Sequence, residues 1–309
     1  MVTIRNIAKE AGVSVSTASR ALNNNSRISE KTRRHVQLVA KRLGYKPNFS
    51  AQNLTRGRAN IVGVIFPIMQ ENAPANPFHI DIMRGISEEL QKHDFEMMVA
   101  VTNDQKGLLK QVESMVDQIR VDYFVVLYSD HTDPITKYLR DHQLRFVIVG
   151  QPVKKGDRFV DNDNVKVGRD ATERLLSNLH VKQPAFVMSD AQKSFEKGRL
   201  NGFEQVMRER ELPSEKLLVN DQVSVTAYLH EHPQIDGLIF ADDVLYIEHA
   251  QRLQPLHIPV ICFNNSQWMQ ILFHDGQVID LQPRKLGRAA IQVLFSQDID
   301  HVYVPYKFN

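Results

Sequence analysis

The chain has 309 residues, of which 42% are hydrophobic, so it is long enough for two or three domains with a sizeable core. Its apolar runs are far shorter than a membrane span and no signal-peptide core opens the sequence, which predicts a soluble, cytoplasmic protein without a membrane partner. The single cysteine, Cys262, excludes an internal disulfide framework, and we expect it to be a small core hydrophobe inside a strand.

The net charge of +2 conceals a strong asymmetry between the two ends of the chain. Residues 1–58 contain twelve Lys or Arg and two Glu, whereas the remaining residues contain 26 Lys or Arg and 34 Asp or Glu. A basic amino-terminal segment on an acidic body indicates that only the first part of the chain binds a polyanion.

Residues 3–23 predict two short helices joined by a tight turn. Thr3 can cap the first helix, Gly12 suits the left-handed backbone at its end, and Ser14 can cap the second helix. The second helix presents side chains that are small, hydrogen-bonding or cationic and include no acid: Val15, Ser16, Thr17, Ser19 and Arg20. This composition is typical of a recognition helix in the major groove of DNA.

A third helix is expected from the cap at Ser29 to about Leu43, ending at Gly44, so residues 1–46 should form a helix-turn-helix DNA-binding domain. Residues 47–58 predict a short hinge helix that is marginal by itself. Its large aliphatic side chain, Leu54, has two interpretations: a residue docked on the next domain, which spacing alone favours, or an apolar wedge in the DNA minor groove.

From residue 59 onward, strand-like runs alternate with amphipathic helices, which predicts an α/β core of two doubly wound parallel-sheet lobes. We expect one lobe to span about 59–159 and 284–297, and the other about 160–283 and 298–309.

Polar side chains follow many of the predicted strands, and ligands bind beyond the carboxyl ends of strands in such sheets. The candidates are mainly acids and amides, with an aromatic, a proline and a cation among them: Asn76, Pro77, Phe78, Asp161, Asp163, Asp190, Arg199, Asp242, Asp243, Asn264, Asn265 and Gln282. Carboxylates and amides can bond adjacent sugar hydroxyls while an aromatic ring covers the apolar face of the sugar. Each could instead cap a helix or lie solvated in a loop.

The headpiece motifs AGVSVSTASRALN and LGYKPNFSAQNLTRGR resemble the lactose/galactose repressor (LacI/GalR) family, and the similarity extends through the core, which is similar to type I periplasmic binding proteins. The resemblance implies that Val15, Ser16 and Arg20 read bases, and that Leu54 intercalates at the operator centre. Thr3, Thr17, Ser19, Asn23 and Tyr45 complete the expected DNA-binding set. It further implies effector binding by Arg199 of the R-x-x-G-F segment and by Asp163 at the lobe crossover.

Within the family, the motifs NPF, VDNDN, ADD and FNN are most similar to the maltose/maltodextrin-operon repressors. Asp242 stands where many relatives have asparagine, and Asn264 where many have aspartate. The expected effector set is therefore Phe78, Asp163, Arg199, Asp242, Asn264 and Gln282.

The sequence thus predicts a homodimeric repressor that binds double-stranded operator DNA under the control of a small sugar, with maltose or a maltodextrin favoured over another sugar or a purine. No cofactor or metal is expected, and a phosphoprotein corepressor is a partner that the sequence leaves open. A glycosidase is disfavoured because the paired acids Asp242 and Asp243 are adjacent at a strand end and would point apart, and the histidines and serines lack the spacing of a metal or nucleophile site. A sugar-binding transport receptor would not explain the basic headpiece.

Overall fold

The computed structural model describes residues 2–45, 60–68, 77–128, 133–220, 223–272 and 277–309. The chain divides into two compact units, Met1–Arg58 and Ala59–Asn309. The expected hinge, Leu54 included, and the candidate Asn76 lie outside the described residues.

The described part of the first unit, residues 2–45, contains three helices, α1 (Ile4–Glu10), α2 (Val15–Leu22) and α3 (Glu30–Arg42). Their apolar faces share one small core that includes Ile7, Ala18 and Val36, none of which is exposed. The core forms because apolar side chains recur at three- to four-residue spacing on each helix.

The helix ends in this unit follow local chemistry. Ser14 Oγ accepts a hydrogen bond from Thr17 N at 3.0 Å, and Ser29 caps α3 in the same way. Gly12 has a left-handed backbone, with a φ of 64°. Thr3 is the N-cap of α1, as expected, and forms a capping box with Asn6, whose Oδ1 accepts from Thr3 N at 2.9 Å and from the Thr3 hydroxyl.

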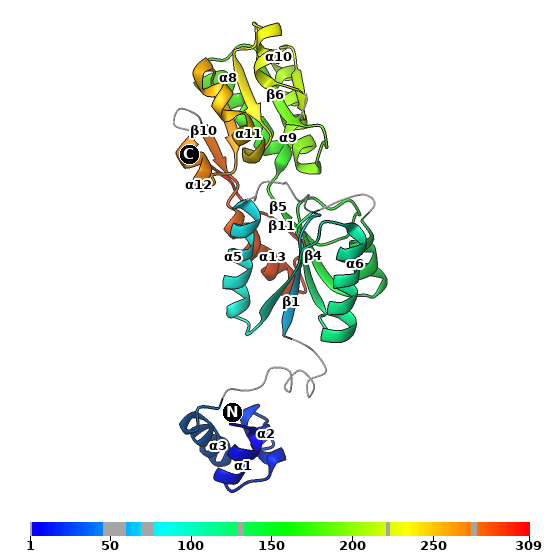
Figure 1. Cartoon of the computed structure of the whole chain (residues 1–309), viewed down its shortest axis with the longest axis vertical. Coiled ribbons are helices and arrows are strands. Elements are labelled where there is room, and N and C mark those ends of the chain that lie inside the picture. Colours follow the sequence, from blue (N-terminus) through cyan, green and yellow to red (C-terminus); the bar gives the residue numbers. More distant parts are fainter. Residues whose placement is uncertain (1, 46–59, 69–76, 129–132, 221–222, 273–276) are drawn as a thin grey trace. The chain divides into compact units, whose positions relative to one another are not determined.

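The second unit contains two six-stranded sheets, one in each lobe (Figure 1). The first sheet is wholly parallel and has the order β11 (His301–Tyr303), β5 (Phe159–Asp161), β4 (Arg145–Val149), β3 (Tyr123–Val126), β1 (Ile61–Ile65) and β2 (Glu96–Ala100). The second has the order β12 (Lys307–Phe308), β10 (Gln277–Asp280), β9 (Val260–Phe263), β8 (Gly237–Phe240), β6 (Pro184–Ser189) and β7 (Glu215–Val219), in which β12 alone is antiparallel.

Helices pack on both faces of each sheet. The first lobe has α5 (Pro77–Gln91), α6 (Gln105–Ser114) with the following π-helical turn η1 (Met115–Ile119), α7 (Pro134–Asp141) and α13 (Pro283–Phe295). The second has α8 (Asn164–Asn178), α9 (Ser194–Glu209), α10 (Val225–Glu231), α11 (Asp243–Leu253) with the 3-10 turn η2 (Gln254–Leu256), and α12 (Gln267–Leu272).

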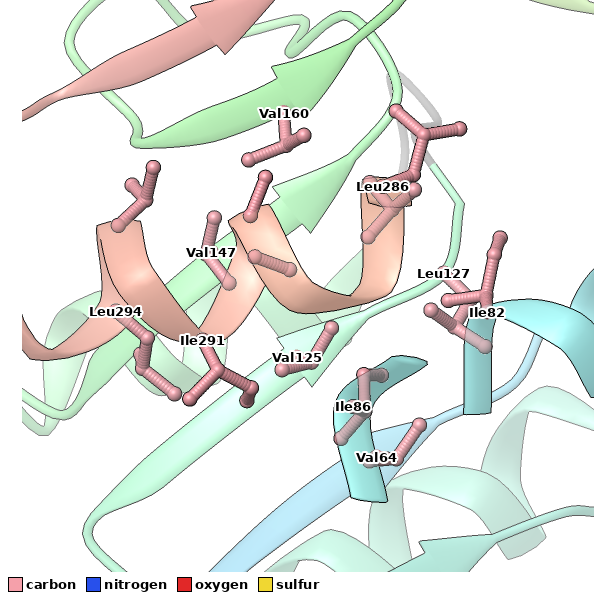
Figure 2. Close-up of a cluster of buried hydrophobic side chains, with 14 of the residues drawn as sticks. Val64, Ile82, Ile86, Val125, Leu127, Val147, Val160, Leu286, Ile291 and Leu294 are labelled. Carbon is pink, nitrogen blue, oxygen red and sulfur yellow. The ribbon is translucent and has the colours of Figure 1, made fainter. Parts of the chain in front are cut away.

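The inner strands β1, β3 and β4 of the first sheet bury both of their faces, since successive side chains point to opposite sides and helices cover both. Val125 and Leu127 lie in the cluster that β1, β3 and β4 form with α5 and α13, which Figure 2 shows. Their neighbours Phe124 and Val126 lie in the cluster that includes Leu108 of α6 and other residues of α6 and α7. Continuous apolar strands therefore specify the three-layer arrangement.

The predicted fold class is confirmed, but the expected lobe boundaries at 159/160 and 297/298 differ from the structure, because β5 extends to Asp161 and β11 pairs with it in the first sheet. Cys262 is a fully buried residue of β9, as expected. In the described part of the chain, no helix is long and apolar enough to span a membrane.

The close packing of α5 on α13 predicts that Gly287→Ala destabilises the core. A Cβ at this position would lie 2.1 Å from Ile82 O and 2.9 Å from Ile86 N, so the helices must separate. We expect a loss of about 1–3 kcal/mol in the free energy of unfolding, measured by urea denaturation. In the control Gly107→Ala, the new Cβ meets the movable carboxylate of Asp104. Equal effects of the two substitutions would contradict the packing argument.

Candidate DNA-binding surface and effector site

The candidate recognition surface lies on α2. Val15, Ser16 and Arg20 are exposed, and Val15 is 44% exposed although it is apolar. The hydroxyls of Ser16 and Thr17 lie 2.9 and 2.8 Å from Ser14 Oγ, so the cap also orders the start of the surface. An apolar side chain, a hydroxyl and a guanidinium are therefore presented together at one helix face.

The other expected DNA-binding residues in the described part of the headpiece lie around this face in different settings. Asn23 is exposed at the carboxyl end of α2, and Ser19 is half-buried. Thr3 is exposed and hydrogen-bonded to Asn6. Tyr45 is half-buried against the headpiece core, so at least part of its ring serves packing.

Both acidic residues of the headpiece are paired. Arg42 Nη2 lies 2.6 Å from Glu10 Oε1, and Arg34 pairs with Glu30 one turn away on α3. These pairs are exposed and contribute little to stability. They do leave the remaining cations of residues 1–58 as a surplus that can neutralise phosphates.

Arg199 is the centre of the polar cluster in the core. It lies on α9 and is only 4% exposed. Nε donates to Asn164 Oδ1 at 3.0 Å, and Nη1 donates to the carbonyl oxygen of Ala241. The guanidinium lies over the rings of Phe195 and Phe263, at 4.8 and 4.4 Å from their centroids. The two bonds use two of the five N–H donors of the guanidinium.

Burial disfavours the charged forms of Arg199 and of its neighbour Asp161. It lowers the pKa of Arg199, although the negative charges of Asp242 and Asp161 act to raise it. It also raises the pKa of Asp161 to about 7, although Asp161 accepts bonds from Asn162 N and Asn164 Nδ2. A buried cation and a carboxylate that is easily protonated at neutral pH thus share Asn164 between them.

A second polar group lies at the ends of β8 and β9. Asp242 Oδ1 caps α11 by accepting from Val244 N at 2.7 Å. Asn264 Nδ2 donates to Asp243 Oδ1 at 2.9 Å. Burial, followed by the charge of Asp242, raises the pKa of Asp243 to about 6. Among the described residues, the second oxygen of Asp243 and the side-chain oxygen of Asn264 find no hydrogen-bond donor although both are buried.

The remaining expected effector residues, Phe78, Gln282 and Asp163, lie in different surroundings. Phe78, near the start of α5, packs against the cores of both lobes. Gln282 has a left-handed backbone, with a φ of 57°, and its side chain bonds Asp280. Asp163 is exposed and caps α8 through a 3.0 Å bond from Lys166 N. The structure therefore groups Arg199, Asp242 and Asn264 in the second lobe, while Asp163 lies at the surface.

Sequence reasoning missed several residues of this region. His79 follows Phe78 and packs against Phe66, with ring centroids 5.5 Å apart. Burial lowers the pKa of His79 to about 4, so its imidazole is neutral at pH 7. The role of Asn164 was also missed, although VDNDN contains it, because its partner Arg199 is distant in sequence. Among the described residues, no group of His, Cys, Asp and Glu is arranged to hold a metal ion.

Two family models match the chain. Residues 3–48 match the model of bacterial regulatory proteins of the lacI family, and residues 61–245 match that of periplasmic binding proteins and the sugar-binding domain of the LacI family.

Individual proteins give the same result over nearly the whole chain. The transcriptional regulator MalR of Streptococcus pneumoniae is 31% identical over 308 residues, covering 95% of this chain and 92% of that protein. The structure of a probable maltose operon repressor MalR from Staphylococcus is 26% identical with a TM-score of 0.73, covering 82% of this chain and 96% of that one. The lac repressor dimer bound to operator has a TM-score of 0.78 at 17% identity, covering 99% of this chain and 97% of that one, and so supports the fold. The chain therefore belongs to the LacI family of bacterial transcriptional regulators.

Proposed function

We propose that this regulator represses a carbohydrate-utilisation operon, and that a maltose or maltodextrin effector bound between the two core lobes controls its affinity for the operator. The observation that carries the proposal is the presence, in one chain, of an exposed recognition helix and of a buried polar cluster around Arg199. The resemblance of the whole chain to MalR proteins favours maltose over other sugars.

The DNA half of the proposal rests on the chemistry of α2. Val15 can contact a thymine methyl group, Ser16 can bond a base edge, and Arg20 can make two bonds to guanine. Thr3, Thr17, Ser19, Asn23 and Tyr45 would contact phosphates or support the helix, and Leu54 would enter the minor groove of the operator. One headpiece reads too few base pairs to be selective, so we propose a homodimer on paired half-sites.

The effector half rests on groups that can bond hydroxyls from several directions. Arg199 would donate with the N–H groups that do not bond Asn164 or Ala241. Asn264 and Asp243 contain buried acceptor atoms without donors among the described residues, and sugar hydroxyls would supply those donors. Phe78 would cover the apolar face of the sugar, while Asp163, Asp242 and Gln282 would accept or donate further bonds.

Control of DNA binding requires that the effector bind one arrangement of the lobes more tightly than another. A sugar that bound both arrangements equally would change nothing. A phosphoprotein corepressor would act in the same way, by differential affinity for the operator-binding arrangement.

Arg20→Ala should weaken binding to the operator more than binding to random duplex DNA. Loss of a bidentate base contact costs about 1–3 kcal/mol, whereas the lost charge alone weakens all DNA binding equally. The measurement is fluorescence anisotropy with an operator obtained by binding selection and with a random duplex. The matched control is Arg27→Ala, which removes the same charge from an exposed turn outside α2. If Arg20→Ala weakened both DNAs to the same extent, its base-reading role would be refuted.

Titration calorimetry with maltose, trehalose, sucrose, galactose and guanine should give heat with maltose and weaker or no heat with the others. Arg199→Lys should lower maltose affinity by about tenfold or more, because one ammonium group cannot replace the planar guanidinium between two rings and two acceptors. Arg169→Lys is the control, since Arg169 pairs with Glu209 at the surface of the same lobe. Heat with another ligand and none with maltose would contradict the maltose assignment.

A further inference from the structure

Three segments cross between the lobes in the described part of the second unit. Residues 161–164 connect β5 to α8, residues 281–282 connect β10 to α13, and residues 304–306 connect β11 to β12. Any change in the relative arrangement of the lobes must change backbone torsions in these segments, since they are the covalent connections described between the two sheets.

One buried side chain joins all three crossovers. Asn162, which is 2% exposed, lies in the first crossover, and its Nδ2 donates to Leu281 O at 3.1 Å and to Val304 O at 2.8 Å. Val304 N also donates to Asp161 O at 2.8 Å. Both amide hydrogens of Asn162 are therefore used, one for each of the other two crossovers.

The same crossover is bonded to Arg199. Asp161 Oδ1 accepts from Asn162 N at 2.8 Å, and Asn164 Nδ2 lies 3.1 and 2.9 Å from the two carboxylate oxygens of Asp161. Asn164 Oδ1 in turn accepts from Arg199 Nε at 3.0 Å. A continuous buried chain of hydrogen bonds thus runs from Arg199 through Asn164 and Asp161 to Asn162.

Close backbone packing prevents these groups from moving independently. A Cβ at Gly198 would lie 2.9 Å from Asn164 Cβ, and a Cβ at Gly168 would lie 2.1 Å from the carbonyl oxygen of Arg199. Only glycine allows α8 and α9 to approach this closely. If α9 moves and carries Arg199 with it, α8 must therefore move too, and with it Asn164 and the crossover of residues 161–164.

We propose that Asn162 is a positioning residue that couples the Arg199 site to the three crossovers, with Asp161 and Asn164 as the intervening links. Because an unpaired buried donor or acceptor is costly, the bonds of Asn162 favour one set of crossover torsions over intermediate ones. A ligand bound to Arg199 changes, through Asn164 and Asp161, the fraction of molecules that have this set of crossover torsions. This inference rests on the proposed effector control.

The test uses the full chain with Asn162→Ala and the milder Asn162→Ser. Each variant is titrated with maltose, and its operator affinity is measured with and without saturating maltose. We expect the maltose-dependent change in operator affinity to fall at least about threefold in Asn162→Ala, while the maltose Kd of the DNA-free protein stays within about threefold of wild type. Asn162→Ser retains one hydroxyl donor, so its maltose-dependent change in operator affinity should lie between those of Asn162→Ala and wild type.

The matched control is Thr172→Val. Thr172 is fully buried on α8 and donates to Gly168 O, so its loss removes a buried hydrogen bond from the same lobe without touching a crossover. This variant should keep the wild-type response to maltose. If Asn162→Ala also kept the full response, the coupling role of Asn162 would be overturned.

A second measurement needs no sugar. Hydrogen–deuterium exchange should become faster at residues 281–284 and 304–306 in both Asn162 variants and remain unchanged in Thr172→Val. Unchanged exchange in the Asn162 variants would refute the link between the crossovers. If wild-type operator binding did not respond to maltose, the proposed function would fail, while the exchange experiment would still decide whether Asn162 holds the crossovers together.

Discussion

The core depends on the burial of one guanidinium. Arg199 is enclosed by two aromatic rings, an amide and a backbone carbonyl, and a charge in such a place is tolerated only where polar or aromatic groups partner it. Its requirement for partners accounts for the burial of Asn164 and Asp161 beside it. Under the proposed function, a ligand that brings a new acceptor changes how the guanidinium is bonded.

The headpiece follows a different physical rule. Its core is small and is formed by residues close together in the sequence. Its surface has a surplus of cations, because its two acidic residues are already paired with Arg34 and Arg42. Phosphate attraction supplies affinity without selectivity, so under the proposed function selectivity comes from Val15, Ser16 and Arg20 and from the pairing of two copies. A regulator of this family therefore needs the core, which provides that pairing and its control, as much as it needs the recognition helix.

Much of the fold could be predicted because it is specified locally. The cap at Ser14, the left-handed turn at Gly12 and the apolar strands are readable from neighbouring residues alone. The pairing of β11 with β5 could not be predicted, since it joins segments about 140 residues apart. For the polar cluster, strand ends pointed to Asp242 and Asn264, but nothing in the sequence pointed to Asn162 and Asn164. Their hydrogen bonds form only when tertiary packing brings Leu281, Val304 and Arg199 to them.

Under the proposed function, a sugar bound in the core changes DNA binding by the same chain. The most direct test is the operator affinity of the full-length wild-type protein, measured in one sample series with increasing maltose. Saturating maltose should change the operator Kd by at least about fivefold, the lower end of ordinary coupling between two sites. A constant operator Kd in the presence of bound maltose would contradict effector control.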